Sequence, residues 1–169
     1  MSDLREQRSK ASIVVERVYA ATLEEVWELW TTKDGFESWW GPQGFRVEVH
    51  EIDARLNGAL RYDMIADSEE MIAAMDKMGQ PRSHPTTSRF SEFAPQSRLV
   101  LTNVIDFLPG VASYESKIAV DFSSLGDTVQ MRVTLDAMHS DEFTKMQKDG
   151  FTSQLSKLDQ RFAKATTSE

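Results

Sequence analysis

Hydrophobic and polar positions alternate near the start of the chain, and the pattern then becomes helical. Ile13, Val15 and Tyr19 fall on one face of a predicted strand, because successive side chains of a strand point to opposite faces. Thr22 and Glu25 form a capping box, in which the Thr22 hydroxyl accepts from a helical amide and Glu25 reaches back. The pattern therefore predicts a strand followed by a helix.

All four tryptophan residues of the sequence lie in the predicted helix and in the segment after it. Trp27 and Trp30 lie on one side of the helix, and a second short helix is predicted over about 34–39. It ends at Gly41-Pro42, because proline cannot continue a helix. Each tryptophan can bury roughly 150–250 Å². The cluster therefore either fills a core or lines a pocket, and its indole N–H groups are candidate donors to a ligand.

From Phe45 onward the hydrophobic period is two, which is typical of half-buried antiparallel strands. Phe45 begins the first such run, and Tyr62 and Met64 belong to the next, after the Asn57-Gly58 turn signal. Later strands are predicted over 89–93, 99–103, 114–122 and 128–135. The short connections favour antiparallel pairing, and about seven strands are expected in all.

Residues 67–87 are too many for an ordinary hairpin loop. Met71, Met75 and Met78 fall on one face of a helix there, and Gly79 follows them. Methionine side chains adapt to varied apolar partners. We expect either a pliable cover over a pocket or a helix face packed on the body.

The end of the chain predicts a long helix over about 141–164, capped by Ser140. One stripe runs along it: Phe143, Met146, Phe151, Leu155, Leu158 and Phe162. Gly150 costs about 1 kcal/mol relative to alanine in a helix. We expect it where the helix closely approaches another backbone.

Several segments together resemble a known superfamily. They are Arg17-Val18-Tyr19-Ala20-Ala21 before Val26-Trp27-Glu28-Leu29-Trp30-Thr31, Trp39-Trp40-Gly41-Pro42 with Gly44-Phe45, the proline-containing turn at 95–101, and Gly150-Phe151 with Leu155 and Leu158. They resemble the START-like (SRPBCC) superfamily, in the bacterial branch similar to the C-terminal domain of activators of the heat shock protein 90 ATPase. The resemblance covers about residues 11–164.

The resemblance implies an α+β helix-grip fold. A curved antiparallel sheet of about seven strands would surround the long C-terminal helix, with two short helices after the first strand. We expect a polar tail at 1–10 and a single domain at 11–165, with 67–87 as a helical insertion. The resemblance further implies a cavity between sheet and helix, and a role in the stress response.

Composition limits the classes of function. The 169 residues are most simply one domain, and the absence of cysteine excludes disulfides and thiolate metal sites. Lys and Arg number 19 against 27 Asp and Glu, a formal charge of −8, which argues against nucleic-acid binding. No apolar run approaches the ~20 residues of a membrane span. We expect a cytoplasmic protein without membrane insertion.

Candidate catalytic groups are few. His50, His84 and His139 lie far apart without metal-ligand spacing, so we expect no metal and no cofactor. His50, Asp63 and Tyr62 are the only ionisable candidates that strand parity suggests for an interior site. Binding is therefore favoured over catalysis.

We expect thirteen residues to border the cavity between sheet and C-terminal helix, although inward-facing residues can also simply pack. They are Trp30, Trp39, Trp40, Phe45, Tyr62, Met64, Met71, Met75, Phe90, Met131, Phe143, Met146 and Phe151. Such a set indicates an apolar pocket, the usual form of a small-molecule site.

Three functions remain open at this level. The first is the binding of an apolar or aromatic small molecule in the cavity. The second is a co-chaperone-like interaction of the heat shock protein 90 ATPase activator type, which predicts an exposed docking patch. The third is a cyclase- or hydrolase-like enzyme that uses the same cavity. The partners expected are a hydrophobic small molecule or a chaperone, and the pattern allows a monomer or a homodimer.

Overall fold

The structure is a computed structural model that describes residues 12–105, 110, 112–136 and 140–167. Its elements follow in the order β1 (Ile13–Tyr19), α2 (Leu23–Thr31), α3 (Lys33–Glu37), β2 (Phe45–Ile52), β3 (Ala59–Ala66), α4 (Glu69–Lys77), β4 (Ser83–Ala94), β5 (Arg98–Ile105), β6 (Tyr114–Ser124), β7 (Val129–Leu135) and α5 (Asp141–Thr167). The strands form one seven-stranded sheet in the order β1-β7-β6-β5-β4-β3-β2, and every described pair is antiparallel.

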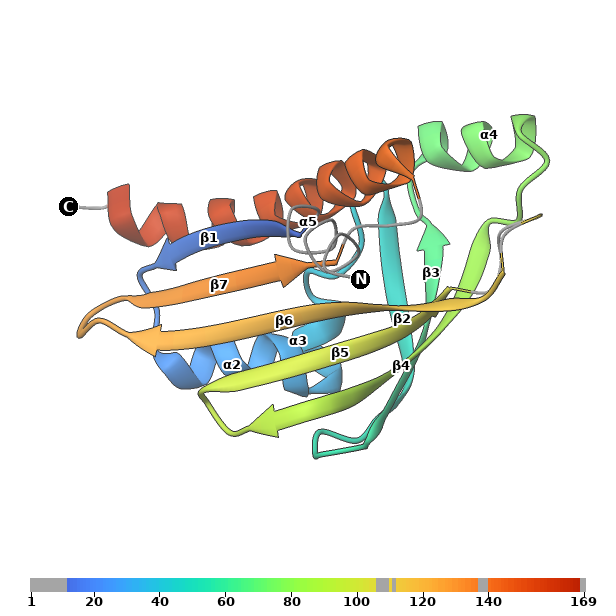
Figure 1. The fold of residues 1–169 in the computed structure, drawn as a ribbon. Coiled ribbons are helices and arrows are strands. Elements are labelled where there is room, and N and C mark those ends of the chain that lie inside the picture. The colour runs from blue at the N-terminus through green and yellow to red at the C-terminus, as the bar shows by residue number, and fades with distance from the viewer. Residues whose placement is uncertain (1–11, 106–109, 111, 137–139, 168–169) are drawn as a thin grey trace.

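The helices take different places around this sheet (Figure 1). In that view α2 and α3 lie behind β5 and β6, and α5 runs along the top beside β1. The short α4 lies at one end, next to the start of α5. This arrangement confirms the predicted α+β helix-grip fold, with two short helices after the first strand.

Side-chain caps begin the helices at the positions that the sequence predicts. Glu25 N–H donates to Thr22 Oγ1 at 3.1 Å, and Thr22 N–H donates to Glu25 Oε1 at 2.9 Å, which completes the capping box. Ser140 Oγ accepts from Phe143 N–H at 3.2 Å at the start of α5. The caps explain why the helix boundaries lie close to those predicted.

The aromatic residues of α2, α3 and the following turn pack against one another. The ring centroids of Trp30 and Trp39 are 5.0 Å apart, those of Trp30 and Trp40 5.4 Å, and those of Phe36 and Trp40 4.6 Å. Trp30, Phe36 and Trp39 are fully buried. The end of the molecule that holds α2 and α3 is therefore a tightly packed core.

Two segments differ from the prediction. β4 begins at Ser83, whereas a strand was expected only from Arg89, so part of the predicted 67–87 insertion belongs to the sheet. α4 contains no buried residue, and Met78 is 60% exposed. Alternation was hard to recognise in the first part of β4 because polar residues occupy both of its faces.

Candidate functional site

The tandem tryptophans lead into a loop that is bound to the middle of α5. Gly41 N–H donates to Gln154 Oε1 at 3.0 Å, and Lys157 Nζ donates to the Gly41 carbonyl oxygen at 2.8 Å. Gln43 N–H also donates to Ser153 Oγ at 3.0 Å. Gly41 adopts φ +97°, a left-handed conformation that favours glycine. These bonds fix α5 relative to the aromatic core.

The indole N–H groups of three tryptophans already have partners inside the protein. Trp30 Nε1–H donates to Met131 Sδ at 3.3 Å, Trp39 Nε1–H to the Leu29 carbonyl oxygen at 2.8 Å, and Trp40 Nε1–H to Tyr62 Oη at 3.0 Å. The expectation that these groups are available to a ligand is therefore wrong for Trp30, Trp39 and Trp40. Their rings and donors stabilise the core instead.

Tyr62 joins this core to the interior face of β4. Its hydroxyl accepts from Trp40 and shares a hydrogen bond with the Thr86 side chain. Burial raises the pKa of Tyr62 to about 12, so the hydroxyl is neutral at physiological pH. Tyr62 can therefore take part in hydrogen bonds without bringing a charge into the interior.

The first half of α5 carries polar atoms that are buried without partners. Gln147 Oε1 and Gln154 Nε2 have no hydrogen-bond partner. The two residues lie on one side of α5, about two turns apart. Between them, a Cβ built on Gly150 would meet no atom within 4 Å. The expectation that Gly150 closely approaches another backbone is wrong, and this part of the helix borders open space.

The inner face of the sheet also carries polar side chains, at one level of three neighbouring strands. Ser88 lies directly opposite Asn103, and Asn103 lies directly opposite Ser116. Ser88 Oγ donates to Asn103 Oδ1. We call Ser88, Asn103 and Ser116 the polar band. Because Ser88 is also paired with the buried Leu60, the band lies on the inner face of the sheet.

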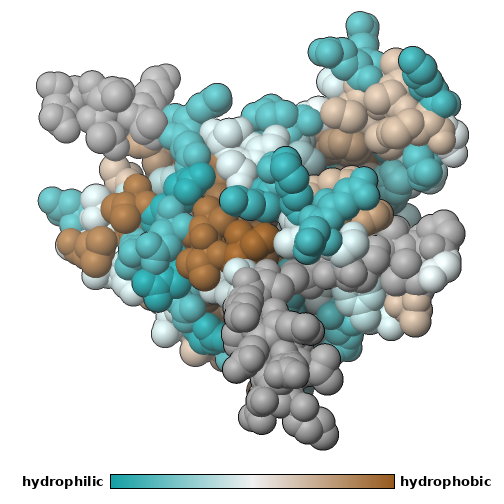
Figure 2. All heavy atoms as spheres, turned by 45° about the horizontal axis from the view of Figure 1, so that its top comes forward, coloured by the Kyte–Doolittle hydropathy of each residue, from teal (hydrophilic) through white to brown (hydrophobic). Residues whose placement is uncertain are grey.

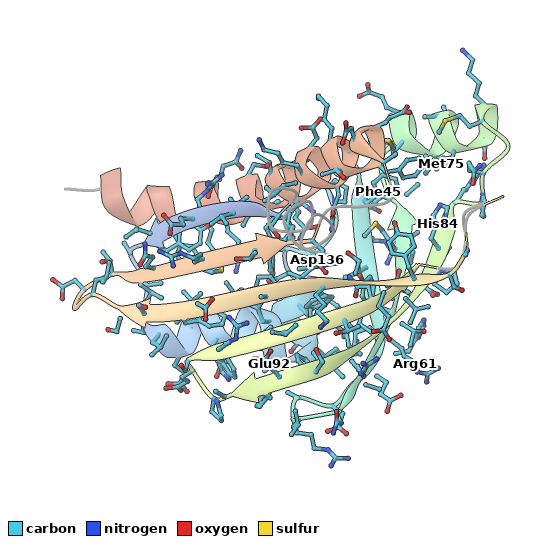
Figure 3. All side chains as sticks on the ribbon, viewed as in Figure 1. Phe45, Arg61, Met75, His84, Glu92 and Asp136 are labelled. Carbon is cyan, nitrogen blue, oxygen red and sulfur yellow. The ribbon has the colours of Figure 1, made fainter. Side chains whose placement is uncertain are left out.

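Burial of the inner residues decreases toward α4. Phe90 and Leu101 are fully buried near the aromatic core, whereas Phe45, Met64 and His84 are only half-buried. Figure 3 shows Phe45, Met75 and His84 at the end of the molecule where α4 lies and α5 begins. The interior is therefore less completely covered at this end. Figure 2 shows a separate group of hydrophobic residues in the middle of the face drawn, between hydrophilic neighbours and away from the α4 end at the upper right.

The predicted cavity residues separate into three groups in the structure. Five are half-buried: Phe45, Met64, Met71, Met75 and Phe143. Trp40, Tyr62 and Phe151 are buried in the core. Four others are fully buried in the core: Trp30, Trp39, Phe90 and Met131. Met146 is 57% exposed and lies outside the candidate site, because its position on α5 is turned away from the side that Phe151 and Gln154 bury.

Sequence reasoning did not identify the polar members of the site. Gln147 and Gln154 follow Phe143 and Phe151 at helical spacings of four and three, which places them on the inward side. Ser116 interrupts an otherwise apolar face of β6 at a position with the parity of the buried Ile118. These spacings are a usable signal for neutral polar side chains on the inward faces.

The other catalytic candidates do not meet in the interior. His50 Nε2 and Asp63 Oδ2 are 3.0 Å apart, and this pair lies on the outer face because the neighbouring Val49 and Tyr62 point inward. His139 lies outside the described residues. Within the described part of the chain, no group of three or more His, Asp or Glu is arranged to hold a metal ion.

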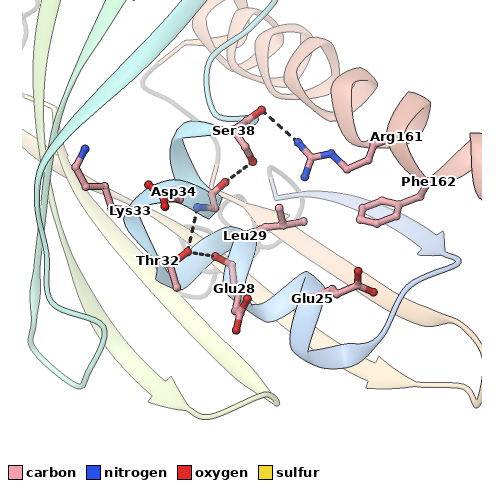
Figure 4. A pocket seen from close by; sticks show the side chains of 10 residues that line it. Glu25, Glu28, Leu29, Thr32, Lys33, Asp34, Ser38, Arg161 and Phe162 are labelled. Atoms are coloured by element: carbon pink, nitrogen blue, oxygen red, sulfur yellow. Dashed lines mark hydrogen bonds between the residues drawn. The ribbon is translucent and has the colours of Figure 1, made fainter.

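A separate cleft of about 770 Å³ lies between α2, α3 and the end of α5 (Figure 4). Its lining includes acidic Glu25, Glu28 and Asp34 and basic Lys33 and Arg161. Arg161 already donates to the Ser38 carbonyl oxygen at 3.4 Å. The cleft opens to the surface and is formed by the end of α5, so it is distinct from the site along the first half of that helix.

A curved antiparallel sheet, two short helices after its first strand and a long terminal helix define the START-like class. The chain belongs to the family of Activator of Hsp90 ATPase homolog 1-like proteins, whose sequence profile matches residues 20–163. No protein of curated function matches the chain in sequence. No helix among the described residues has the length and apolar character needed to cross a membrane.

Solved structures share the fold at low sequence identity. Protein CV1439 from Chromobacterium violaceum is 21% identical with a TM-score of 0.71, over 90% of this chain and 97% of that one. The AHSA1 protein from Silicibacter pomeroyi is 18% identical with a TM-score of 0.70, over 90% and 98% of the two chains. CalU16 from Micromonospora echinospora is 17% identical with a TM-score of 0.60, over 88% and 74%. At these identities the similarity establishes the fold.

Proposed function

We propose that this protein binds an apolar or aromatic small molecule between the first half of α5 and the inner face of β3 to β6. The observation that carries the proposal is the pair of buried, unpartnered atoms Gln147 Oε1 and Gln154 Nε2, on either side of the unpacked Gly150. A buried polar atom without a partner costs about 1–3 kcal/mol. A bound molecule would fill the space and supply the missing partners.

Apolar side chains around this space suit the body of such a ligand. Phe151 packs against Trp40 with ring centroids 6.0 Å apart, which gives the space one rigid aromatic wall. Phe45, Met64 and Phe143 lie at the less buried end. A mostly apolar surface with a few polar groups is the usual composition of a small-molecule site.

α4 is positioned to act as an adaptable cover for this end. Met71 and Met75 are half-buried, and Met71 Cε would lie 3.1 Å from a Cβ at Gly44, next to Phe45. Thioether side chains adapt to ligands of different shape. Because α4 has no buried residue, it can shift at little cost in packing.

Filling the space tests the proposal directly. Leucine at Gly150 should occupy the open volume and abolish binding of the neutral fluorescent probe N-phenyl-1-naphthylamine, while the helix keeps its circular dichroism signal. Alanine at the same position is the matched control: it should preserve binding and raise stability by up to about 1 kcal/mol. Unchanged probe binding by Gly150→Leu would contradict the proposed site.

Family membership supports a second candidate, an interaction with a chaperone ATPase of the Hsp90 type, since the family profile covers most of the chain. The measurement is the ATPase rate of an Hsp90 chaperone with and without this protein. A raised rate that persists in Gly150→Leu would place this interaction on a surface separate from the proposed ligand site. An unchanged rate would count against the interaction.

A further inference from the structure

We infer that the ligand is uncharged and presents a hydrogen-bond-accepting oxygen, of the carbonyl or hydroxyl class, to Gln154 Nε2. This inference rests on the proposed function and specifies the chemistry of the molecule bound there. It depends on three observations: the fixed orientation of one amide, the composition of the inner face of the sheet, and the hydrogen bonds and ion pairs that nearby charged groups already make.

The orientation of the Gln154 amide is fixed by its neighbour. Gly41 N–H can only donate, so it must face Gln154 Oε1, which it does at 3.0 Å. The NH₂ group is therefore the free end of the amide. Gln154 is only 4% exposed and its Nε2 has no partner, so a donor points into the interior. An accepting oxygen on the ligand would satisfy it.

The inner face of the sheet supplies neutral polar groups. The polar band of Ser88, Asn103 and Ser116 consists of hydroxyl and amide side chains in register. On the described inner face of β3 to β6 there is no Asp, Glu, Lys or Arg. A polar ligand group can therefore form hydrogen bonds on this side, but it finds no permanent counter-charge there.

Two charged groups that contact α5 or the tryptophan loop are already engaged. Lys157 Nζ donates to the carbonyl oxygens of Gly41 at 2.8 Å and Phe45 at 3.4 Å. Arg17 is paired with Asp159 at 3.2 Å, nearer the other end of the helix. His84 is the ionisable side chain of the inner face of β4 and is half-buried at the α4 end. Burying an ion without a partner costs far more than a hydrogen bond returns, so the site selects neutral molecules.

Three probes with the same aromatic body separate these properties. Naphthalene has no polar group, 2-acetonaphthone adds a neutral accepting oxygen, and 2-naphthoate adds a negative charge. Each is measured on the full chain by its displacement of N-phenyl-1-naphthylamine. We expect 2-acetonaphthone to bind roughly fivefold more tightly than naphthalene, and 2-naphthoate to bind more weakly than either.

Two variants of Gln154 assign the preference to its NH₂ group. Gln154→Met removes the donor and also the acceptor of Gly41 N–H. Gln154→Glu keeps an oxygen for Gly41 N–H and removes the donor when its carboxyl group is ionised. In both, the affinity of 2-acetonaphthone relative to that of naphthalene, measured on the same variant, should fall to about one. Gln160→Met makes the same change at an exposed position of α5 and should leave the preference intact.

The outcomes distinguish the inference from the proposed function. If the preference for 2-acetonaphthone persists in both Gln154 variants, or if 2-naphthoate competes equally well, the inference is overturned and the site remains. If the full chain binds neither the fluorescent probe nor any of the three compounds, the proposed function is overturned together with the inference.

Discussion

Gln154 accepts a hydrogen bond from Gly41 N–H at 3.0 Å and so joins the tandem-tryptophan loop to the middle of α5. One side of this amide supports the fold, while its NH₂ group is buried without a partner. The same residue therefore belongs to the structural framework and to the proposed ligand site. A buried network with one unsatisfied member costs stability, which a bound ligand would recover.

The hydrogen bond between Trp40 and Tyr62 should be measurable as a coupling energy. Tyr62→Phe leaves the Trp40 N–H buried without its acceptor, so we expect a loss of about 1–3 kcal/mol in the free energy of unfolding. Trp40→Phe removes the N–H donor and replaces the indole with a smaller ring. A double-mutant cycle in urea should give a coupling of about 1 kcal/mol, and an additive pair would contradict the bond.

Stability should decrease at alkaline pH. Burial, followed by the hydrogen bond to Asp159, raises the pKa of Tyr19 above its ordinary 10.0, and burial raises that of Tyr62 to about 12. In the unfolded chain both phenol groups have a pKa near 10. Their contribution to the stability of the folded protein is therefore complete below pH 10 and is lost as the pH rises above it. Urea unfolding between pH 9 and about pH 11 should show a smaller decrease for Tyr19→Phe than for the wild type. An identical pH dependence would exclude Tyr19 as a cause.

Lys157 should control the order of the loop that follows the tryptophans. Lys157→Met removes the donor to the Gly41 and Phe45 carbonyl oxygens. Burial lowers the pKa of Lys157, which shows that holding the ammonium there has a cost. We therefore expect little change in global stability but roughly fivefold faster hydrogen exchange at the Gly41 and Gln43 amides. Lys148→Met, at an exposed position of α5, should leave that exchange unchanged.

The methionines of α4 should affect binding more than folding. Met71→Gln and Met75→Gln place polar groups at half-buried positions on a helix without buried residues, so each should cost less than about 1 kcal/mol of stability. Each should weaken N-phenyl-1-naphthylamine binding several-fold if α4 covers the site. Met78→Gln is the matched control because Met78 is 60% exposed. Equal effects of all three substitutions on probe binding would show that the side of α4 that carries Met71 and Met75 does not cover the site.

The predictable part of the structure is the part encoded by local pattern. The strand at 13–19 and the box formed by Thr22 and Glu25 were predicted and are present, because alternation and capping depend on residues close in sequence. The beginning of β4 was not predicted. Its residues lack strong alternation and become a strand only because β3 is available to pair with them.

The candidate site was predicted only in outline. Local pattern placed Tyr62 and Phe151 on inward faces, and both are buried. It could not show that Trp30 would use its N–H on Met131, a residue distant in sequence. It also gave no reason to choose Gln154, whose importance depends on a hydrogen bond to Gly41 across more than a hundred residues.

The order of most strands and helices along the chain, many of their inward positions and the family resemblance follow from the sequence by itself, because period, caps and motifs are local properties of the chain. Only the tertiary structure decided which inward residues pack solidly and which border open space. That distinction depends on how closely α5 approaches the sheet at each point, and this distance is set by contacts between segments far apart in sequence, such as Gly41 with Gln154.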